Sequence, residues 1–149
     1  MNPVRTVIKL SDKSNSQILV GIDPGKDKTG LAIVEKSGSL IEKKIIKSDN
    51  LKSYLEGFIH KYKIKKIIMG DGTHSKNLIP LIRDLNLESL LFLIDETGTT
   101  RDAERLYFKE NPPGGIKKLL SLFLSWKPSR PVDDYAAFLL VRKYLKDNG

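Results

Sequence analysis

Acidic residues recur at positions that directly follow short apolar runs of the chain. Asp23, Asp71 and the pair Asp95–Glu96 each close such a run, and Asp133–Asp134 open a later amphipathic segment. Carboxylates that converge repel one another unless a cation lies between them, and oxygen ligands in a chain without cysteine favour Mg²⁺ or Mn²⁺. A pair of such ions can activate water and stabilise the leaving oxygen of a phosphodiester. The spacing therefore indicates a metal-dependent hydrolytic site, although any one of these acids alone could end a strand or cap a helix.

Short strands and amphipathic helices must bring these acids together. Apolar runs bounded by turn residues predict strands at 18–23, 30–35 and 40–47, and their short links make them antiparallel. The elements expected next are a helix, strand, helix and strand at 48–62, 64–70, 77–85 and 90–95, then helices at 99–109, from about 116 and at 132–146. This order predicts an α/β fold with a five-stranded mixed sheet, three antiparallel strands followed by parallel strands, flanked by helices.

The ends of the elements give further expectations. A polar N-terminal segment at 1–17, with a weak edge-strand signal at 4–10, precedes what is expected to be a single domain at 18–149. Thr99 and Asp102 fit an N-terminal capping arrangement for the helix at 99–109.

The last predicted helix carries two adjacent aspartates at its start. Asp133 precedes Ala136, Ala137 and Leu140 by three, four and seven positions, so it lies on the stripe expected to face the sheet. Asp134 shares a weaker stripe of its own, and spacing alone does not choose between the two. Because sites assemble at the carboxyl ends of strands in such sheets, either aspartate could join the acids there.

The composition narrows the classes of partner and chemistry. The 149 residues carry 26 Lys and Arg against 18 Asp and Glu, a formal net charge of +8. This excess favours a polyanionic partner, most simply nucleic acid. The absence of cysteine excludes disulfides, thiolate zinc sites and cysteine nucleophiles. No apolar run is long enough to span a membrane and no signal-peptide core is evident, so we expect a cytoplasmic protein.

Several basic and hydroxyl side chains could hold the phosphates of such a partner. The candidates for nucleic-acid binding are Lys26, Lys28, Lys76, Thr99, Thr100, Arg101 and Arg130. Arg101 follows two threonines at a predicted helix N-terminus, where backbone N–H groups also attract phosphate. Trp126 could stack a base, and His74 lies in the loop beside Asp71, although a packed tryptophan and a solvated histidine are the commoner outcomes.

Three segments together resemble a known family. Residues 22–25 and 29–32, Ile-Asp-Pro-Gly and Thr-Gly-Leu-Ala, resemble the first-strand motif of RuvC and YqgF-type nucleases of the ribonuclease H-like superfamily. The Asp-Glu pair at 95–96, followed by Thr-Thr at 99–100, is similar to the second YqgF signature. The segment 132–137 resembles the third, an aspartate three positions before paired alanines. The chain departs from the family at Thr97, where an arginine is common.

The resemblance implies a metal-dependent endonuclease that acts on structured nucleic acid. It implies that Asp23, Glu96 and Asp133 form the catalytic, metal-binding set, with Asp71 as a possible fourth ligand, whereas Asp134 stays open from the spacing. The implied cofactor is Mg²⁺ or Mn²⁺, the implied substrate is Holliday junction DNA or precursor ribosomal RNA, and a junction resolvase is expected to act as a homodimer.

Two other classes of function are also compatible with the residues. The turn after Asp23 has the glycine and threonine of a phosphate loop in an ATPase or kinase lobe of the actin and sugar-kinase type, although that architecture needs two lobes and usually a longer chain. A non-catalytic nucleic-acid-binding module with the same fold is the other alternative.

Overall fold

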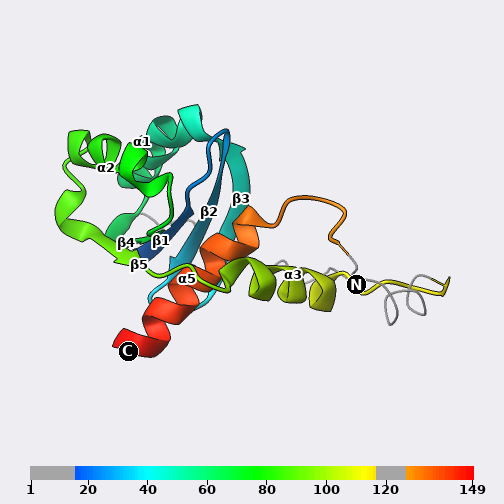
Figure 1. Ribbon diagram of the computed structural model, residues 1–149. Coiled ribbons are helices and arrows are strands. Elements are labelled where there is room, and N and C mark those ends of the chain that lie inside the picture. The colour runs from blue at the N-terminus through cyan, green and yellow to red at the C-terminus, as the bar shows by residue number, and fades with distance from the viewer. Residues whose placement is uncertain (1–15, 117–126) are drawn as a thin grey trace, which may run out of the picture.

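The computed structural model describes residues 16–116 and 127–149, and its centre is one five-stranded sheet (Figure 1). The spatial order of the strands is β3-β2-β1-β4-β5. β1 pairs antiparallel with β2 and β2 antiparallel with β3, whereas β4 lies parallel to both β1 and β5. The mixed sheet predicted from the sequence is therefore confirmed. The strands are β1 Gln17–Asp23, β2 Lys28–Glu35, β3 Leu40–Lys47, β4 Lys63–Gly70 and β5 Leu91–Ile94.

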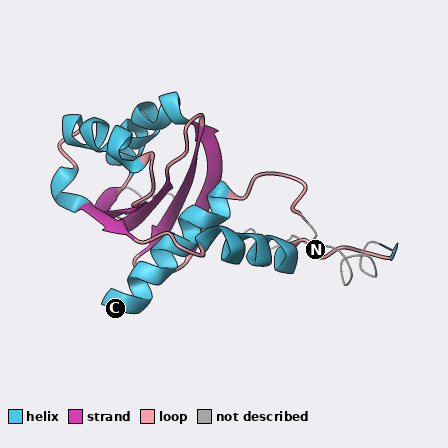
Figure 2. Ribbon diagram, in the orientation of Figure 1, coloured by secondary structure: helices cyan, strands magenta, loops and turns pink. Residues whose placement is uncertain are grey.

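Helices cover both faces of this sheet (Figure 2). α1 (Leu51–Lys61) and α2 (Ser75–Asp84) pack on one face, and α5 (Asp133–Asn148) crosses the other. α3 (Thr99–Glu110) does not lie on the sheet but packs against α5 through a small apolar cluster. The molecule thus has three layers, with α5 as the element that lies over the middle strands on the second face.

The alternation of side chains along β1 explains why both faces are covered. Ile18, Val20 and Ile22 are fully buried in the core beneath α1 and α2, whereas Leu19 belongs to the core beneath α5. Because successive side chains of a strand point to opposite faces, Asp23 lies on the same face as Leu19, the face that α5 covers. The register of β1 therefore places this carboxyl group on the α5 side of the sheet.

Two helix starts differ from the simplest expectation. A short 3-10 turn, Ser48–Asn50, precedes α1. α3 begins at Thr99 as predicted, but the predicted capping by Thr99 and Asp102 is wrong, since no side-chain cap is formed. Gly98 is the N-cap, with a φ of 79°, and its carbonyl accepts a hydrogen bond from the Asp102 N–H at 3.1 Å. Glycine adopts this left-handed conformation without the strain that a side chain would add.

Three features predicted from the sequence lie outside the described residues. They are the weak edge strand at 4–10, most of the helix expected from about 116, and Trp126. In the part of the chain that is described, no helix combines the length and apolar character that a membrane span requires.

Candidate active site

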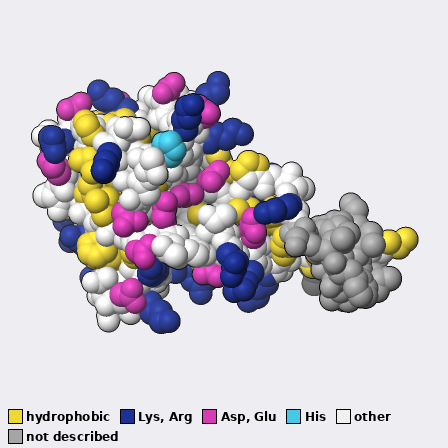
Figure 3. Space-filling view, viewed as in Figure 1, with side chains coloured by type: hydrophobic (Ala, Val, Ile, Leu, Met, Phe, Trp, Pro, Cys, Tyr) yellow, Lys and Arg dark blue, Asp and Glu magenta, His cyan; other side chains and the backbone are white. Residues whose placement is uncertain are grey.

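Acidic side chains from three separate elements gather at one end of the sheet, on the α5 face. Asp23 is the last residue of β1, Glu96 follows β5 by two residues, and Asp133 is the first residue of α5. Figure 3 shows acidic side chains as a band across this face, with a histidine beside it and basic side chains mainly around the rim. This end is where the carboxyl ends of the parallel strands β1, β4 and β5 meet.

Two glycines let α5 approach the sheet closely enough to bring Asp133 to β1. A Cβ at Gly30, the β2 residue paired with Asp23, would overlap the backbone carbonyl of Asp133. A Cβ at Gly21 would overlap the carbonyl oxygen of Ala137, one helical turn further along α5. The absence of side chains at these two positions therefore sets the depth at which α5 lies and the placement of Asp133.

Asp23 and Asp133 are direct neighbours in this site. Burial, the charges of Asp133 and Glu96, and a side-chain hydrogen bond to Asp133 together raise the pKa of Asp23 to about 7. Because ionised carboxylates only accept hydrogen bonds, a hydrogen bond between two carboxyl groups requires a proton on one of them. The pair therefore holds a proton near neutral pH when no cation is present to separate the charges.

Glu96 lies against the end of β4. Its Oε2 fills the position that a Cβ of Gly70 would take, and its Oε1 does the same at Gly72. The Oε2 atom is buried and has no hydrogen-bond partner. Burial and the charges of Asp71 and Asp95 raise the pKa of Glu96, and His74 partly opposes them. An unpaired buried carboxylate oxygen is costly, so this atom calls for a partner that the described protein groups do not supply.

The acid pair at 95–96 divides into two different roles. Asp95 Oδ1 accepts hydrogen bonds from the backbone N–H of Thr97 at 2.9 Å and from its hydroxyl at 2.6 Å. These hydrogen bonds lower the pKa of Asp95 and turn its carboxylate into the local loop. Only Glu96 of the pair lies at the glycine surface of β4. Thr97, which stands where an arginine is common in the family that the sequence resembles, thus orders the turn that presents Glu96.

Asp71 adds a further carboxylate beside Glu96. Its backbone N–H donates to the carbonyl of Ile94 at 3.0 Å, which ties the end of β4 to the end of β5. The Asp71 side chain is exposed, and its charge contributes to the raised pKa of Glu96.

The donor chemistry of these residues fits a divalent metal ion. Carboxylate oxygens are the ligands that Mg²⁺ and Mn²⁺ prefer, and the raised pKa values of Asp23 and Glu96 arise in part because like charges face each other without a cation. The unpartnered Oε2 of Glu96 is a free ligand atom. In the described residues, however, no three His, Asp or Glu side chains already converge on one metal position. The structure thus holds a carboxylate pair, Asp23 with Asp133, and a nearby Glu96.

Asp134 points away from this cluster, into a cationic pocket. It is only 4% exposed. Arg130 donates to Oδ1 at 3.0 Å and to Oδ2 at 3.2 Å, and Lys43 donates to Oδ2 at 3.4 Å. With both oxygens engaged in this way, we do not include Asp134 in the proposed metal-binding set. Arg130, a candidate for nucleic-acid binding, is likewise engaged within the protein.

Lys43 is a residue of this region that sequence reasoning did not single out. It lies on β3 within a run of lysines, and nothing in its spacing distinguishes it from a solvated side chain. Only the sheet register, which brings β3 to the start of α5, reveals its contact with Asp134.

Thr29, which belongs to the first motif, has a structural role that the sequence did not reveal. It is fully buried, and its hydroxyl hydrogen-bonds to that of Ser48 at 2.8 Å. The Ser48 hydroxyl in turn donates to the carbonyl of Gly25 at 3.0 Å. This chain of hydrogen bonds fixes the loop that follows Asp23.

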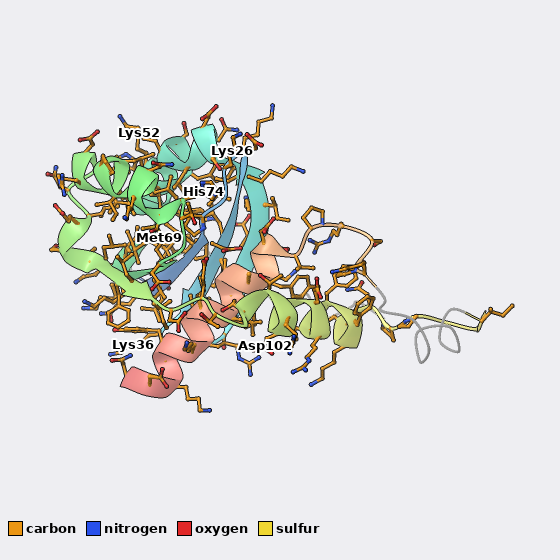
Figure 4. All side chains as sticks on the ribbon, viewed as in Figure 1. Lys26, Lys36, Lys52, Met69, His74 and Asp102 are labelled. Atoms are coloured by element: carbon orange, nitrogen blue, oxygen red, sulfur yellow. The ribbon has the colours of Figure 1, made fainter. Side chains whose placement is uncertain are left out.

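Basic candidates near the loop after Asp23 lie beside the acidic cluster. Lys26, Lys52 and His74 line one shallow hollow between that loop, the start of α1 and the start of α2 (Figure 4). Lys28 lies on the other side of the same loop and lines a separate hollow with Lys26. Lys76, on α2, is exposed.

The remaining candidates lie at the start of α3. Thr100 and Arg101 line an open hollow together with Arg105 and Lys127, whereas Thr99 faces a neighbouring hollow that α5 also lines. Five of the predicted nucleic-acid-binding residues therefore fall into two groups, Lys26 and Lys28 around the loop after Asp23 and Thr99, Thr100 and Arg101 at the start of α3. Lys76 lies apart on α2, and Arg130 is bound to Asp134.

The strand order, with an antiparallel meander beside two parallel neighbours and carboxylates at the strand ends, is that of the ribonuclease H-like fold implied by the sequence motifs. The solved structure of a viral resolvase confirms this fold. The fowlpox virus resolvase, in complex with Holliday junction DNA, matches with a TM-score of 0.56 over 87% of this chain and 97% of its own, at 16% identity. Also similar is RuvC of T. thermophilus in complex with a Holliday junction substrate, with a TM-score of 0.48 over 89% and 96% of the two chains, at 13% identity.

Comparisons of the sequence alone find no match. No protein-family model matches the chain, and no curated protein matches it. The chain therefore shares the fold of the viral resolvase, while the YqgF detail of the sequence resemblance stays a prediction.

Proposed function

We propose that this protein is a metal-dependent endonuclease that hydrolyses phosphodiester bonds in structured nucleic acid. The observation that carries the proposal is the gathering of Asp23, Glu96 and Asp133 at the carboxyl ends of the strands of a ribonuclease H-like sheet. The net charge of +8 supports a polyanionic substrate around this small acidic centre.

The three carboxylates would hold the metal and so orient the reaction. Divalent ions, two in the mechanism that we propose, supply the Lewis acidity that activates a water molecule and neutralises charge on the phosphate. Asp23 and Asp133 would bind from the end of β1 and the start of α5, and Glu96 would contribute its unpartnered Oε2 from beyond β5. Asp71, exposed beside Glu96, is the candidate for a fourth ligand.

The basic residues would bind the backbone of the substrate. Lys26 lies on the loop after Asp23, Lys28 begins β2, Lys76 lies on α2 and Arg101 lies at the start of α3. Phosphates on either side of the acidic centre would therefore meet a positive side chain. Contacts of this kind position the backbone and carry no sequence preference of their own.

Four-way DNA junctions are the first substrate to test. The fowlpox virus resolvase was solved with Holliday junction DNA, and its fold spans most of this chain. Precursor ribosomal RNA is the other substrate that the sequence resemblance implies. For a junction with two equivalent strands to cut, we propose that the protein acts as a homodimer.

The decisive experiment compares cleavage of a four-way DNA junction and a structured precursor-type RNA side by side, with Mg²⁺, with Mn²⁺ and with EDTA. We expect metal-dependent cleavage of one substrate by the wild type. We expect the Asp23→Asn variant to bind that substrate without cutting it. Wild-type protein that leaves both substrates intact in either metal would overturn the proposal, and binding without any cleavage would identify a non-catalytic module.

A further inference from the structure

Asp134 is the one Asp, Glu, Lys, Arg or His side chain that is buried among the described residues, and it directly follows Asp133 in the chain. Its carboxylate is bound on two sides. Arg130 reaches it in a bidentate manner at 3.0 and 3.2 Å, and Lys43 contributes a contact at 3.4 Å from β3. Burial works to raise the pKa of Asp134, but the hydrogen bonds from Arg130 and the charges of Lys43 and Arg130 hold it below its ordinary value. The residue is therefore a buried, ionised anchor and not a free ligand.

The two cations are themselves held by aromatic rings. The Lys43 ammonium lies 3.9 Å from the centre of the Tyr135 ring. The Arg130 guanidinium lies 5.3 Å from the same ring and 5.5 Å from that of Tyr107 on α3. The Tyr135 hydroxyl donates to Glu110 at 2.7 Å. Tyr135 belongs to α5 and Tyr107 to α3, so these contacts join Lys43 of β3 and Arg130 to the first turn of α5, and Arg130 also to α3.

The first turn of α5 thus carries two aspartates with different neighbours: Asp134 contacts Arg130 and Lys43, and Asp133 lies beside Asp23. Consecutive residues of a helix point about 100° apart, which lets Asp134 face Lys43 and Arg130 while Asp133 faces Asp23. Because Asp133 directly precedes Asp134, the contacts of Asp134 with Arg130 and Lys43 also restrain the backbone from which the Asp133 side chain extends.

We propose that Asp134 is a positioning residue that, through Arg130 and Lys43, fixes the first turn of α5 and so keeps Asp133 beside Asp23. This inference rests on the function proposed above, in which Asp133 binds metal. It differs from a direct role of Asp134 in the metal site, because the effect of Asp134 passes through Arg130 and Lys43.

The test uses three variants of the full chain and two reference variants. Asp134→Asn removes the charge with little change of shape, Arg130→Gln removes its partner, and the double variant removes both. Asp133→Asn reports the loss of a proposed ligand. Glu88→Gln is the matched control, since Glu88 pairs with Arg83 in a bidentate manner at 2.9 Å but both side chains are exposed.

Three measurements separate a positioning role from the alternatives. We expect Asp134→Asn to lower kcat for junction cleavage by roughly 10–100-fold while KM stays within about twofold, as for other residues that orient metal ligands. We expect Mn²⁺ to bind more weakly to Asp134→Asn, by a smaller factor than to Asp133→Asn, in calorimetry without substrate. The double variant should be no worse than the worse single variant, because both changes interrupt one contact. Glu88→Gln should match the wild type throughout.

Amide exchange at the start of α5 gives a readout that needs no activity. The Ala136 N–H donates to the carbonyl of Val132 at 2.9 Å and reports the first turn of the helix. We expect its exchange to be roughly tenfold faster in Asp134→Asn and in Arg130→Gln at a temperature far below unfolding. Should Asp134→Asn fail to fold, Arg130→Gln carries the same measurements, since the Arg130 side chain is 42% exposed.

The outcomes are distinct. Wild-type kcat and Mn²⁺ affinity in Asp134→Asn would overturn the positioning role, and so would additive effects of Asp134→Asn and Arg130→Gln, which would assign Asp134 a role of its own at the metal. A wild-type protein that neither binds Mn²⁺ nor cleaves nucleic acid would overturn the proposed function. In that case amide exchange at Ala136 still tests the positioning role. A rate in Asp134→Asn that equals the wild-type rate contradicts the role of Asp134 in fixing the first turn, and a faster rate supports it.

Discussion

At the scale of single residues, Asp23 shows how the site is set up for a cation. Burial comes first among the causes that raise its pKa to about 7, and the charges of Asp133 and Glu96 add to it. In solution an aspartate titrates near 3.8, so folding moves Asp23 into an environment that favours its neutral form. A divalent ion at this position would reverse that preference, since it stabilises the ionised carboxylates.

This environment predicts how Asp23 affects stability as a function of pH. The folded-state pKa lies above the unfolded value, so the stability that the protonated group contributes is full below about pH 4 and is lost as the pH rises toward about 7. Asp23→Asn removes this loss. In urea unfolding with EDTA, we expect the free energy of unfolding of the variant to rise relative to that of the wild type by on the order of 1–3 kcal/mol between pH 4 and pH 8.

The same experiment has an internal control. Addition of Mn²⁺ at pH 8 should stabilise the wild type and should stabilise Asp23→Asn much less, because a ligand that binds only the folded state raises its stability by mass action. If the free energy of unfolding of the two proteins changed with pH in parallel, the pKa of Asp23 would not be raised by folding, and the prediction would be wrong.

At the scale of elements, the close approach of α5 to the sheet makes the site possible. The helix backbone at Asp133 and Ala137 occupies the space where Gly30 and Gly21 have no side chain. The depth of this helix is thus encoded in two strands far from it in sequence, and the position of Asp133 follows from it.

We expect Gly30→Ala to push the start of α5 away from β2. Its Cβ would overlap the Asp133 carbonyl, so the free energy of unfolding should fall by about 1–3 kcal/mol in urea titrations. Gly57→Ala is the matched control, because a Cβ at Gly57 in α1 meets nothing within 4 Å. It should be neutral or should stabilise the protein by about 0.5–1 kcal/mol. Equal effects of the two substitutions would contradict the role of Gly30 as the contact point.

The elements themselves were accessible from the sequence, because their signals are local. The strand at 40–47 is found at its predicted bounds, and α3 begins at the predicted Thr99. The capping of α3 was predicted wrongly: Thr99 and Asp102 were expected to cap the helix, but the N-cap is Gly98 in the left-handed conformation. Local composition identified the turn but not which residue of it adopts the special conformation.

The division of labour between Asp133 and Asp134 could not be predicted in the same way. Helical spacing places both near the sheet, and the difference depends on Lys43, which is 91 positions away from Asp134 in the chain. Such a contact has no periodic signature, since it arises only when β3, β2 and α5 are assembled. Similarly, Glu96 could be found at a strand end, but the two glycines that seat its carboxylate lie on another strand and its loop.

At the scale of the whole molecule, charge is arranged around one centre. The chain has a net charge of +8, yet the face that carries the candidate site shows a band of acidic side chains with basic ones mainly toward the rim (Figure 3). A metal-bound acidic centre within a positive surround would attract a nucleic-acid backbone and hold its phosphates at the carboxylates. Only those basic side chains that lie near the path of the nucleic-acid backbone are expected to contribute to binding.

Salt dependence of binding tests which lysines belong to that path. Lys26 lines the hollow that His74 also lines, beside the acidic cluster, whereas Lys36 lies in the turn between β2 and β3 at the far end of the sheet (Figure 4). Each lysine that contacts a phosphate releases about one counterion, so the slope of log Kd against log salt should fall by about 1 in Lys26→Gln. Lys36→Gln removes the same charge from the molecule and should leave the slope unchanged. These titrations use a four-way junction and Ca²⁺, which is expected to permit binding without supporting cleavage. Equal slopes for both variants would mean that net charge, and not its layout around Asp23, governs binding.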